Sequence, residues 1–296
     1  MSKTLKSHLA LVLVAFIYGA NYSIAKMVMF NYLNPFGFIV LRVFGAGILF
    51  YIIHALFVKE KVQTKDLKKL FICSVFGIAG NMQLFFKGLS LTTPVNASVL
   101  MLNAPVFVLI FSAFMYKTKP RVIQILGTLV SFTGAFWLIA GNKFHLASDT
   151  ALGDMFITFN AISYAFYLVY VKDLLLKYKS LTVIKYSFLF GAILVLPFGF
   201  NDLRTTQFAT FTPTIWWAIA FVVIGTTFIA YLLNAWALQK TSSTVVGSYI
   251  YLQPIIASAI GVYLGQDVLT TQKVLAALLV FSGVYLVSKK SVIKKE

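Results

Sequence analysis

Two stripes of polar side chains recur at helical spacing within otherwise apolar sequence. Tyr18, Asn21 and Tyr22 stand at i, i+3 and i+4, which places them on one face of a helix. A second stripe, spaced i, i+3, i+4 and i+7, consists of Asn160, Ser163, Tyr164 and Tyr167. Amide and phenol groups hydrogen-bond polar ligands, and tyrosine rings pack on the apolar parts of a ligand. The stripes predict walls of a ligand-binding cavity, with an interhelical hydrogen bond as the alternative for each residue alone.

Other apolar stretches carry single polar groups that belong to the same candidate binding set. They are Asn81, Asn103, Tyr231, Asn234, Ser248 and Tyr251. Pro105 and Pro254 occupy matching places in two of these stretches. Because proline removes a backbone donor and kinks a helix, the matched pair predicts hinges, with static bends as the alternative.

Two cations lie within apolar sequence, Lys26 and Arg42. A cation at the centre of a membrane helix costs about 2.5–3.5 kcal/mol on insertion scales, so each needs a partner or a route to water. Snorkelling toward the nearer interface is one interpretation. The other is that they attract a carboxylate or phosphate on a ligand, with Lys87 as a further contributor.

None of the eight acidic residues lies in the middle of an apolar stretch. The chain therefore lacks the usual membrane carboxylate that neutralises a cationic ligand or carries a proton, which favours neutral, zwitterionic or anionic ligands. Cys73 is the single cysteine, and the three histidines are scattered, so we expect no disulfide, metal site or cofactor. No nucleophile and base stand together, and we do not expect an enzyme.

These residues belong to a chain of 296 residues that is 60% hydrophobic and 11% charged, whereas soluble proteins are about 25% charged. A helix needs about 20 mostly apolar residues to cross a bilayer. Ten such runs are present, at 7–29, 35–57, 69–90, 94–116, 121–140, 151–171, 181–200, 214–238, 243–265 and 270–288. Because lipid offers no partner for unpaired backbone groups, each run is predicted to be helical. The expected fold is an all-α polytopic membrane protein with about ten transmembrane helices.

Basic residues alternate from one side of the predicted membrane to the other. Nineteen of the 25 Lys and Arg residues fall on the side of the N-terminus. The positive-inside rule places that side, with both termini, in the cytoplasm. The net charge of +17 needs no nucleic acid as partner, because anionic lipid headgroups at these loops are a sufficient one.

The two halves of the chain resemble each other at offsets of 149 and 146 residues. The aligned pairs include Pro105 with Pro254, Thr92 with Thr241, Tyr18 with Tyr164 and Lys26 with Lys172. Each half, 1–143 and 144–296, holds five predicted spans, and five is odd, so the second half is inserted upside down relative to the first. Inverted repeats of this kind are a transporter architecture with the ligand site near the midplane. A duplicated bundle without transport is the alternative.

Several pieces occur in a recognisable order. They are FIYGANYSIAK (16–26), LRVFGAGILF (41–50), KGLSLTTPVNASVLMLNAPVF (87–107), ILGTLVSFTGAFWLI (125–139), ALQKTSSTVVGSYIYLQPII (237–256) and VLAALLVFSGVYLVSKK (274–290). The ordered set resembles the EamA-type transporters of the drug/metabolite transporter superfamily over nearly the whole chain. The resemblance implies ten helices in two inverted repeats, a central cavity, a bacterial inner-membrane location, and export or facilitated passage of small metabolites, often amino acids.

By position, the family's aromatic and Gly-Asn stretch of helix 1 falls on Tyr18, Gly19 and Asn21. Its helix 1 lysine falls on Lys26 and its helix 2 arginine on Arg42. The family's Gly-Glu pairs after helices 4 and 9 are replaced here by Lys117-Thr118 and Gln266-Asp267.

We therefore expect alternating-access transport of a small-molecule substrate, an amino acid or a related zwitterionic or anionic metabolite. A multidrug exporter is the first alternative, and a membrane assembly subunit that transports nothing is the second.

Overall fold

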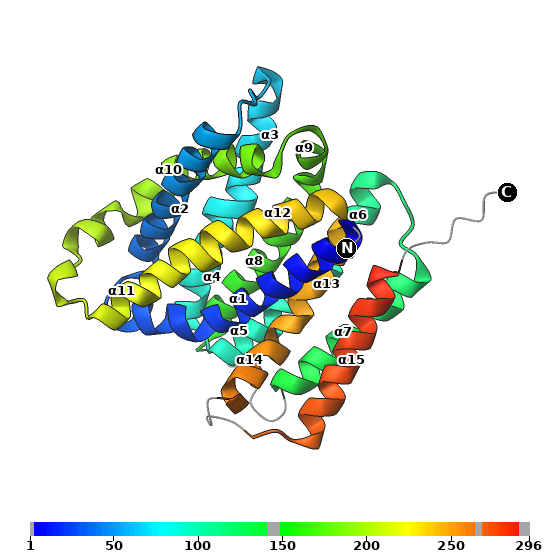
Figure 1. Ribbon diagram of the computed structural model, residues 1–296. Coiled ribbons are helices and arrows are strands. Elements are labelled where there is room, and N and C mark those ends of the chain that lie inside the picture. Colours follow the sequence, from blue (N-terminus) through cyan, green and yellow to red (C-terminus); the bar gives the residue numbers. More distant parts are fainter. Residues whose placement is uncertain (1–2, 141–148, 264–267, 290–296) are drawn as a thin grey trace.

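The fold is built from helices that cross the molecule from end to end (Figure 1). The computed structural model describes residues 3–140, 149–263 and 268–289, apart from a few side chains. Within that part all regular secondary structure is helical, and nine helical stretches are long and apolar enough to span a membrane. The N-terminal helix adds a further apolar segment over Leu5–Asn21. The chain is thus an all-α polytopic membrane protein with about ten helices, as the sequence predicts.

The helices follow the predicted spans to within a few residues at most ends. The first half contains α1 (Lys3–Asn31), α2 (Pro35–Phe57), α3 (Thr64–Ser74), η1 (Val75–Ala79), α4 (Gly80–Leu91), α5 (Pro94–Met101), α6 (Ala104–Tyr116) and α7 (Val122–Ala140). The second half contains α8 (Ala151–Tyr170), α9 (Lys172–Lys177), α10 (Ser180–Thr205), η2 (Phe208–Thr210), α11 (Pro213–Ala220), η3 (Phe221–Ile229), α12 (Ala230–Lys240), α13 (Ser243–Ser248), η4 (Tyr249–Tyr251), α14 (Leu252–Tyr263) and α15 (Thr271–Ser288). The predicted boundary between the halves, at residues 143 and 144, lies outside the described residues, as does the Gln266-Asp267 pair.

Two predicted spans, 69–90 and 214–238, contain a π-helical segment where the sequence predicts continuous α-helix. These segments are η1 and η3, and their first residues, Val75 and Phe221, are separated by the same 146-residue offset as the aligned halves. The backbone hydrogen bond of a π-turn joins residues i and i+5 instead of i and i+4. The side chains that follow the turn are therefore rotated about the helix axis relative to those of a continuous α-helix. Both segments lie next to the polar residues of the cavity.

Two other predicted spans, 94–116 and 243–265, are interrupted. The first breaks between α5 and α6, and the second passes through the short 3-10 segment η4. Pro105 and Pro254 lie in the first helical turn after these interruptions, where the missing proline N–H costs no intrahelical hydrogen bond. The prolines therefore follow a break rather than bend a continuous helix, and their role as hinges stays a prediction.

The N-terminal ends of the interrupted helices are capped alike. The Thr93 hydroxyl accepts a hydrogen bond from the Asn96 backbone N–H at 3.1 Å. The Ser242 hydroxyl, 149 residues later, accepts one from the Val245 N–H at 3.3 Å. A hydroxyl at this position satisfies one of the free backbone donors of the first turn.

Several helix contacts have a counterpart that involves the corresponding helices of the other half. Helix α2 packs on α10, and α7 packs on α15. Helix α4 packs on α8 as α12 packs on α1, and α6 packs on α8 as α14 packs on α1. The cavity described below forms where α1 and α8 meet these neighbours.

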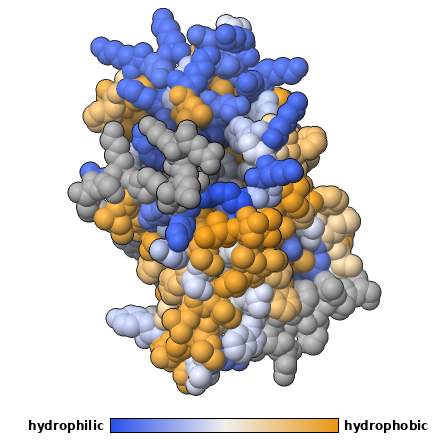
Figure 2. Space-filling model, turned by 90° about the vertical axis from the view of Figure 1, so that its right-hand side faces the viewer, coloured by the Kyte–Doolittle hydropathy of each residue, from blue (hydrophilic) through white to orange (hydrophobic). Residues whose placement is uncertain are grey.

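Polarity is distributed as a lipid solvent requires. Large apolar side chains such as Phe114, Trp217 and Tyr285 are 81%, 76% and 67% exposed, whereas Asn160 and Arg42 are buried. Figure 2 shows hydrophilic side chains gathered at its top, the end of the molecule that carries α3, and hydrophobic side chains over the faces below. The exposed residues at that end include Lys59, Lys61, Lys65, Lys68 and Lys69.

Glycines let α7 and α15 approach closely. A Cβ atom at Gly283 would come within 2.2 Å of Ser131 Oγ and 2.5 Å of the Gly127 carbonyl oxygen. The Ser131 hydroxyl in turn donates to the Val280 carbonyl oxygen at 3.3 Å. Lipid provides no hydrophobic driving force for helix association, and small residues allow the close van der Waals packing that holds membrane helices together.

We predict that Gly283→Ala destabilises the protein by about 1–3 kcal/mol, because an added methyl group overpacks this interface. The measurement is the unfolding midpoint of the purified protein in detergent. Gly47→Ala is the matched control, because a Cβ there meets only Phe188 Cβ at 4.0 Å. Equal midpoints for the two variants would contradict the tight packing of α7 on α15.

Candidate functional site

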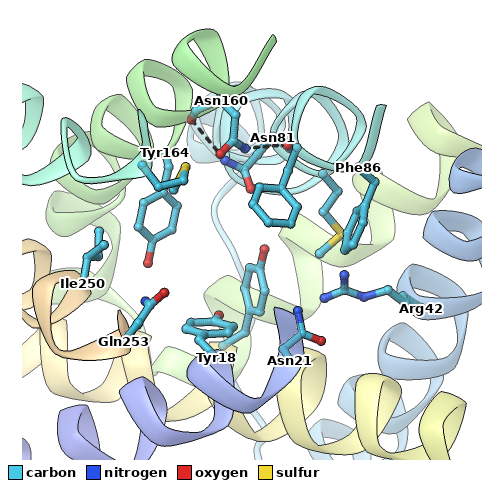
Figure 3. A pocket seen from close by; sticks show the side chains of 13 residues that line it. Tyr18, Asn21, Arg42, Asn81, Phe86, Asn160, Tyr164, Ile250 and Gln253 are labelled. Carbon is cyan, nitrogen blue, oxygen red and sulfur yellow. Dashed lines mark hydrogen bonds between the residues drawn. The ribbon is translucent and has the colours of Figure 1, made fainter. Parts of the chain in front are cut away.

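A cavity of about 100 Å³ lies between α1, α2, α4, α5, α8, α12 and the η4–α14 segment (Figure 3). Both halves of the chain contribute to its wall. The lining residues are Tyr18, Asn21, Arg42, Asn81, Met82, Phe85, Phe86, Met101, Asn160, Tyr164, Tyr231, Ile250 and Gln253. None of the lining residues is acidic.

Seven residues of the predicted binding set line this cavity. The seven residues are Tyr18, Asn21, Arg42, Asn81, Asn160, Tyr164 and Tyr231. The two predicted stripes do meet, since Tyr18 and Asn21 of α1 face Asn160 and Tyr164 of α8 across the cavity (Figure 3). That these residues bind a substrate stays a prediction.

The prediction did not include the other lining residues. Gln253 gives a sequence signal, because it is a polar residue beside Pro254 in an apolar span. Met82, Phe85, Phe86 and Met101 give none, since apolar residues of a membrane helix look alike whether they face lipid, protein or a cavity.

Arg42 brings a buried charge to the cavity. Its side chain is 4% exposed, and its guanidinium points into the cavity opposite Gln253 (Figure 3), so it does not snorkel to the interface. Its Nε and Nη2 donate to Thr227 Oγ1 at 3.1 Å and Thr226 Oγ1 at 3.5 Å. Its Cζ lies 4.7 Å from the centre of the Phe86 ring. Among the described residues no carboxylate lies within ion-pair distance of it.

Asn81 of α4 and Asn160 of α8 join the two halves at the cavity wall. Asn160 Nδ2 donates to the Asn81 carbonyl oxygen at 2.7 Å, and Asn81 Nδ2 donates to the Asn160 carbonyl oxygen at 3.5 Å (Figure 3). The side-chain oxygens of Asn21 and Asn160 are buried and have no donor within the described structure. An unsatisfied buried acceptor costs about 1–3 kcal/mol, so these amides favour a donor supplied by a ligand or water.

The carbonyl groups of η1 hold side chains from the opposite half. The Tyr231 hydroxyl donates to the Gly77 carbonyl oxygen at 3.3 Å, and the Ser163 hydroxyl donates to the Phe76 carbonyl oxygen at 2.8 Å. This use of the η1 backbone fixes the lining residue Tyr231 in place.

Several predicted residues lie behind the wall. Asn234 Nδ2 donates to the Tyr164 hydroxyl at 2.7 Å, so it positions a lining residue. Tyr167 is 3% exposed and packs on Gly77, where a Cβ atom would come within 2.3 Å of its ring. The buried hydroxyl of Tyr251 has no hydrogen-bond partner in the described part.

Two further predicted residues donate to nearby backbone carbonyls of their own segments. Asn103 Nδ2 donates to the Leu100 carbonyl oxygen at 3.1 Å, and the Ser248 hydroxyl donates to the Val245 carbonyl oxygen at 2.8 Å. Binding by these residues remains an untested prediction. The side chains of Tyr22 and Lys26 lie outside the described part of the chain.

The charged groups near the ends of α8 have protein partners. The Asp154 carboxylate accepts hydrogen bonds from Thr92 at 2.5 Å, Asn96 at 3.4 Å and Thr150 at 3.1 Å. At the other end, Lys172 Nζ donates to the Thr241 carbonyl oxygen at 2.7 Å and to a carbonyl at the end of α12. Neither group lines the cavity.

Comparisons with known proteins give a family model, relatives named as transporters and a shared fold. The family described as "EamA-like transporter family" matches residues 5–140 and 151–289. An Archaeoglobus fulgidus protein named "Uncharacterized transporter" is 27% identical over 96% of this chain and 98% of its own. The Salmonella typhimurium "Uncharacterized inner membrane transporter YicL" is 26% identical over 98% of each chain. A solved crystal structure shares the fold with a TM-score of 0.79 at 17% identity, covering 99% of this chain and 98% of its own.

The cavity wall predicts a pattern of thiol labelling. Cys73 is the single cysteine of the chain and is buried, so the Cys73→Ala variant has no thiol of its own to react with the label. We expect Gln253→Cys to react with a small methanethiosulfonate reagent about tenfold faster than Ser248→Cys, because thiol reactivity follows exposure and Ser248 is buried away from the cavity. Mass spectrometry of the purified protein measures both rates. Equal rates would remove Gln253 from the wall.

Proposed function

Because the chain belongs to the EamA-like transporter family, we propose that it carries an amino acid, or a related zwitterionic or anionic metabolite, across the membrane. The observation that carries the proposal is Arg42, a buried guanidinium that faces the cavity without a carboxylate within ion-pair distance in the described structure. A ligand carboxylate supplies the missing charge, and such charge-assisted pairs are among the strongest hydrogen bonds in proteins.

The opposite side of the cavity suits the other end of a zwitterion. Gln253 and Tyr164 lie there, across the cavity from Arg42 (Figure 3). Their amide and phenol oxygens are able to accept hydrogen bonds from an ammonium group. Phe85, Phe86 and the methionines Met82 and Met101 offer apolar contact to a side chain between the two ends. A single ligand with both charges therefore meets a complementary group at each side.

Cavity size and charge disfavour the alternative of a multidrug exporter. Sites for drug-sized ligands occupy about 300–1,000 Å³, whereas this cavity measures about 100 Å³. A lipophilic cation would also lie against Arg42 with no carboxylate among the lining residues to balance it.

We propose transport by alternating access, in which two inverted five-helix repeats rock about the cavity. The matched π segments η1 and η3, the matched caps Thr93 and Ser242, and the matched helix contacts support a two-fold relation between the repeats. Pro105 and Pro254 lie beside matched interruptions, which supports hinges at these places. A site shared by both repeats near the midplane is the arrangement that such motion requires.

We place the protein in the bacterial inner membrane with both termini in the cytoplasm. The lysines exposed beside α3 support this orientation, since cytoplasmic loops carry the excess of basic residues. Anionic lipid headgroups are the proposed partner of these lysines, at about 1 kcal/mol per basic residue near the membrane surface.

Uptake into proteoliposomes tests the proposal. We expect the purified protein to move at least one radiolabelled amino acid, and Arg42→Gln to lower that uptake about tenfold or more by removing a charged hydrogen-bond donor. Arg204→Gln is the matched control, because Arg204 is exposed at the end of α10. Arg42→Lys keeps the charge and should retain part of the activity.

Two results would contradict the proposed substrate class. One is uptake of lipophilic cations without uptake of any amino acid, which would favour the multidrug exporter. The other is unchanged amino-acid uptake by Arg42→Gln in protein that remains folded. Liposomes without protein provide the baseline.

A further inference from the structure

The Arg42 guanidinium uses only part of its hydrogen-bonding capacity within the protein. Its side edge, formed by Nε–H and one Nη2–H, donates to Thr227 and Thr226. The end edge, formed by Nη1 and the second Nη2–H, has no hydrogen-bond partner within the described structure and points into the cavity (Figure 3). A planar guanidinium matches a carboxylate with two parallel hydrogen bonds along one edge.

The two threonine hydroxyls can only accept from Arg42, because their protons are already committed. Thr226 Oγ1 and Thr227 Oγ1 each donate to the Val222 carbonyl oxygen at 2.7 Å. Both threonines are fully buried. Their oxygen lone pairs are therefore left for the Nε and Nη2 donors of the guanidinium.

The π-helical backbone of η3 makes this arrangement possible. Thr226 and Thr227 are residues i+4 and i+5 from Val222, and both lie within Phe221–Ile229. In an α-helix a threonine hydroxyl back-bonds the carbonyl four residues earlier. A π-turn closes at i+5, which places two consecutive threonines beside one carbonyl. Two neighbouring hydroxyls then match the two donors of one guanidinium edge.

Two aromatic rings lie close to the same group. The Arg42 Cζ lies 4.7 Å from the centre of the Phe86 ring and 5.7 Å from that of Phe38. The guanidinium therefore has two hydroxyl partners and two ring neighbours within the protein before a ligand arrives. Such pre-organisation lowers the entropy that binding would otherwise cost.

We propose that Thr226 and Thr227 are positioning residues that hold Arg42 with its end edge toward the cavity, and that this geometry selects a planar carboxylate on the substrate. The inference rests on the proposed function, which pairs Arg42 with a ligand carboxylate, and adds to it the two residues that orient the guanidinium for that carboxylate.

The test compares an acid with its amide. The probe is the amino acid that wild-type proteoliposomes take up fastest, and the competitor is the same amino acid with its carboxylate converted to a carboxamide. We expect Thr227→Val, which removes the hydroxyl without changing the shape, to raise KM for the acid about tenfold with little change in maximal rate. The selectivity for acid over amide should fall by the same factor, and further in the Thr226→Val/Thr227→Val variant.

Two controls separate positioning from general damage. Thr227→Ser keeps the hydroxyl and should restore both KM and selectivity. Thr128→Val removes a buried hydroxyl of α7 that does not line the cavity, and should leave both unchanged. Unfolding midpoints and size-exclusion profiles establish that each variant is folded.

The outcomes distinguish this inference from the proposed function. If Arg42→Gln loses the selectivity and Thr227→Val and the double variant keep it, the arginine recognises the carboxylate without the threonines and the inference is overturned. A rise in the KM of the acid that is matched by an equal rise in the inhibition constant of the amide would also overturn it, because only general packing would then be affected. If wild-type protein takes up no amino acid, the proposed function fails and the inference fails with it.

Discussion

Lipid provides no hydrogen-bond partner, and this constraint governs the molecule from its backbone to its cavity. It requires helical backbone throughout the spans and turns polar side chains inward, so that Asn81, Asn160 and Arg42 are buried while large apolar side chains such as Phe114 and Trp217 are exposed. Polar groups that must be buried have to solvate one another. In this chain several do so by joining the two halves, and two of the buried acceptors left unmatched in the described structure, Asn21 Oδ1 and Asn160 Oδ1, belong to residues that line the cavity.

Hydropathy predicts the spans well, because insertion into the bilayer depends on the summed hydropathy of about 20 residues. Hydropathy does not predict where the helix type changes within a span. The π segments η1 and η3 contain partners of single distant residues, as in the Arg42 bonds to Thr226 and Thr227 and the Tyr231 bond to the Gly77 carbonyl. These contacts join residues more than 150 positions apart, and the local sequence does not encode them.

Helical spacing predicts which residues share a polar face, but not whether that face contacts a cavity or another helix. Tyr18 of α1 and Tyr164 of α8 both line the cavity, as their spacing predicted. The stripe of α8 continues to Tyr167, yet that ring packs on η1 instead. Where α13, η4 and α14 succeed one another, Ile250 and Gln253 line the cavity, whereas Ser248 and Tyr251 do not.

The contact between Gly77 and Tyr167 makes the substitutions tolerated at one position depend on the residue at the other, although the two are distant in sequence. A methyl group at position 77 would overlap the tyrosine ring, so a larger residue there is acceptable only after position 167 has become smaller. The opposite order, a smaller residue at 167 first, would leave a void but no collision. Substitutions at this pair are therefore ordered in time, and related chains should show the two positions changing together.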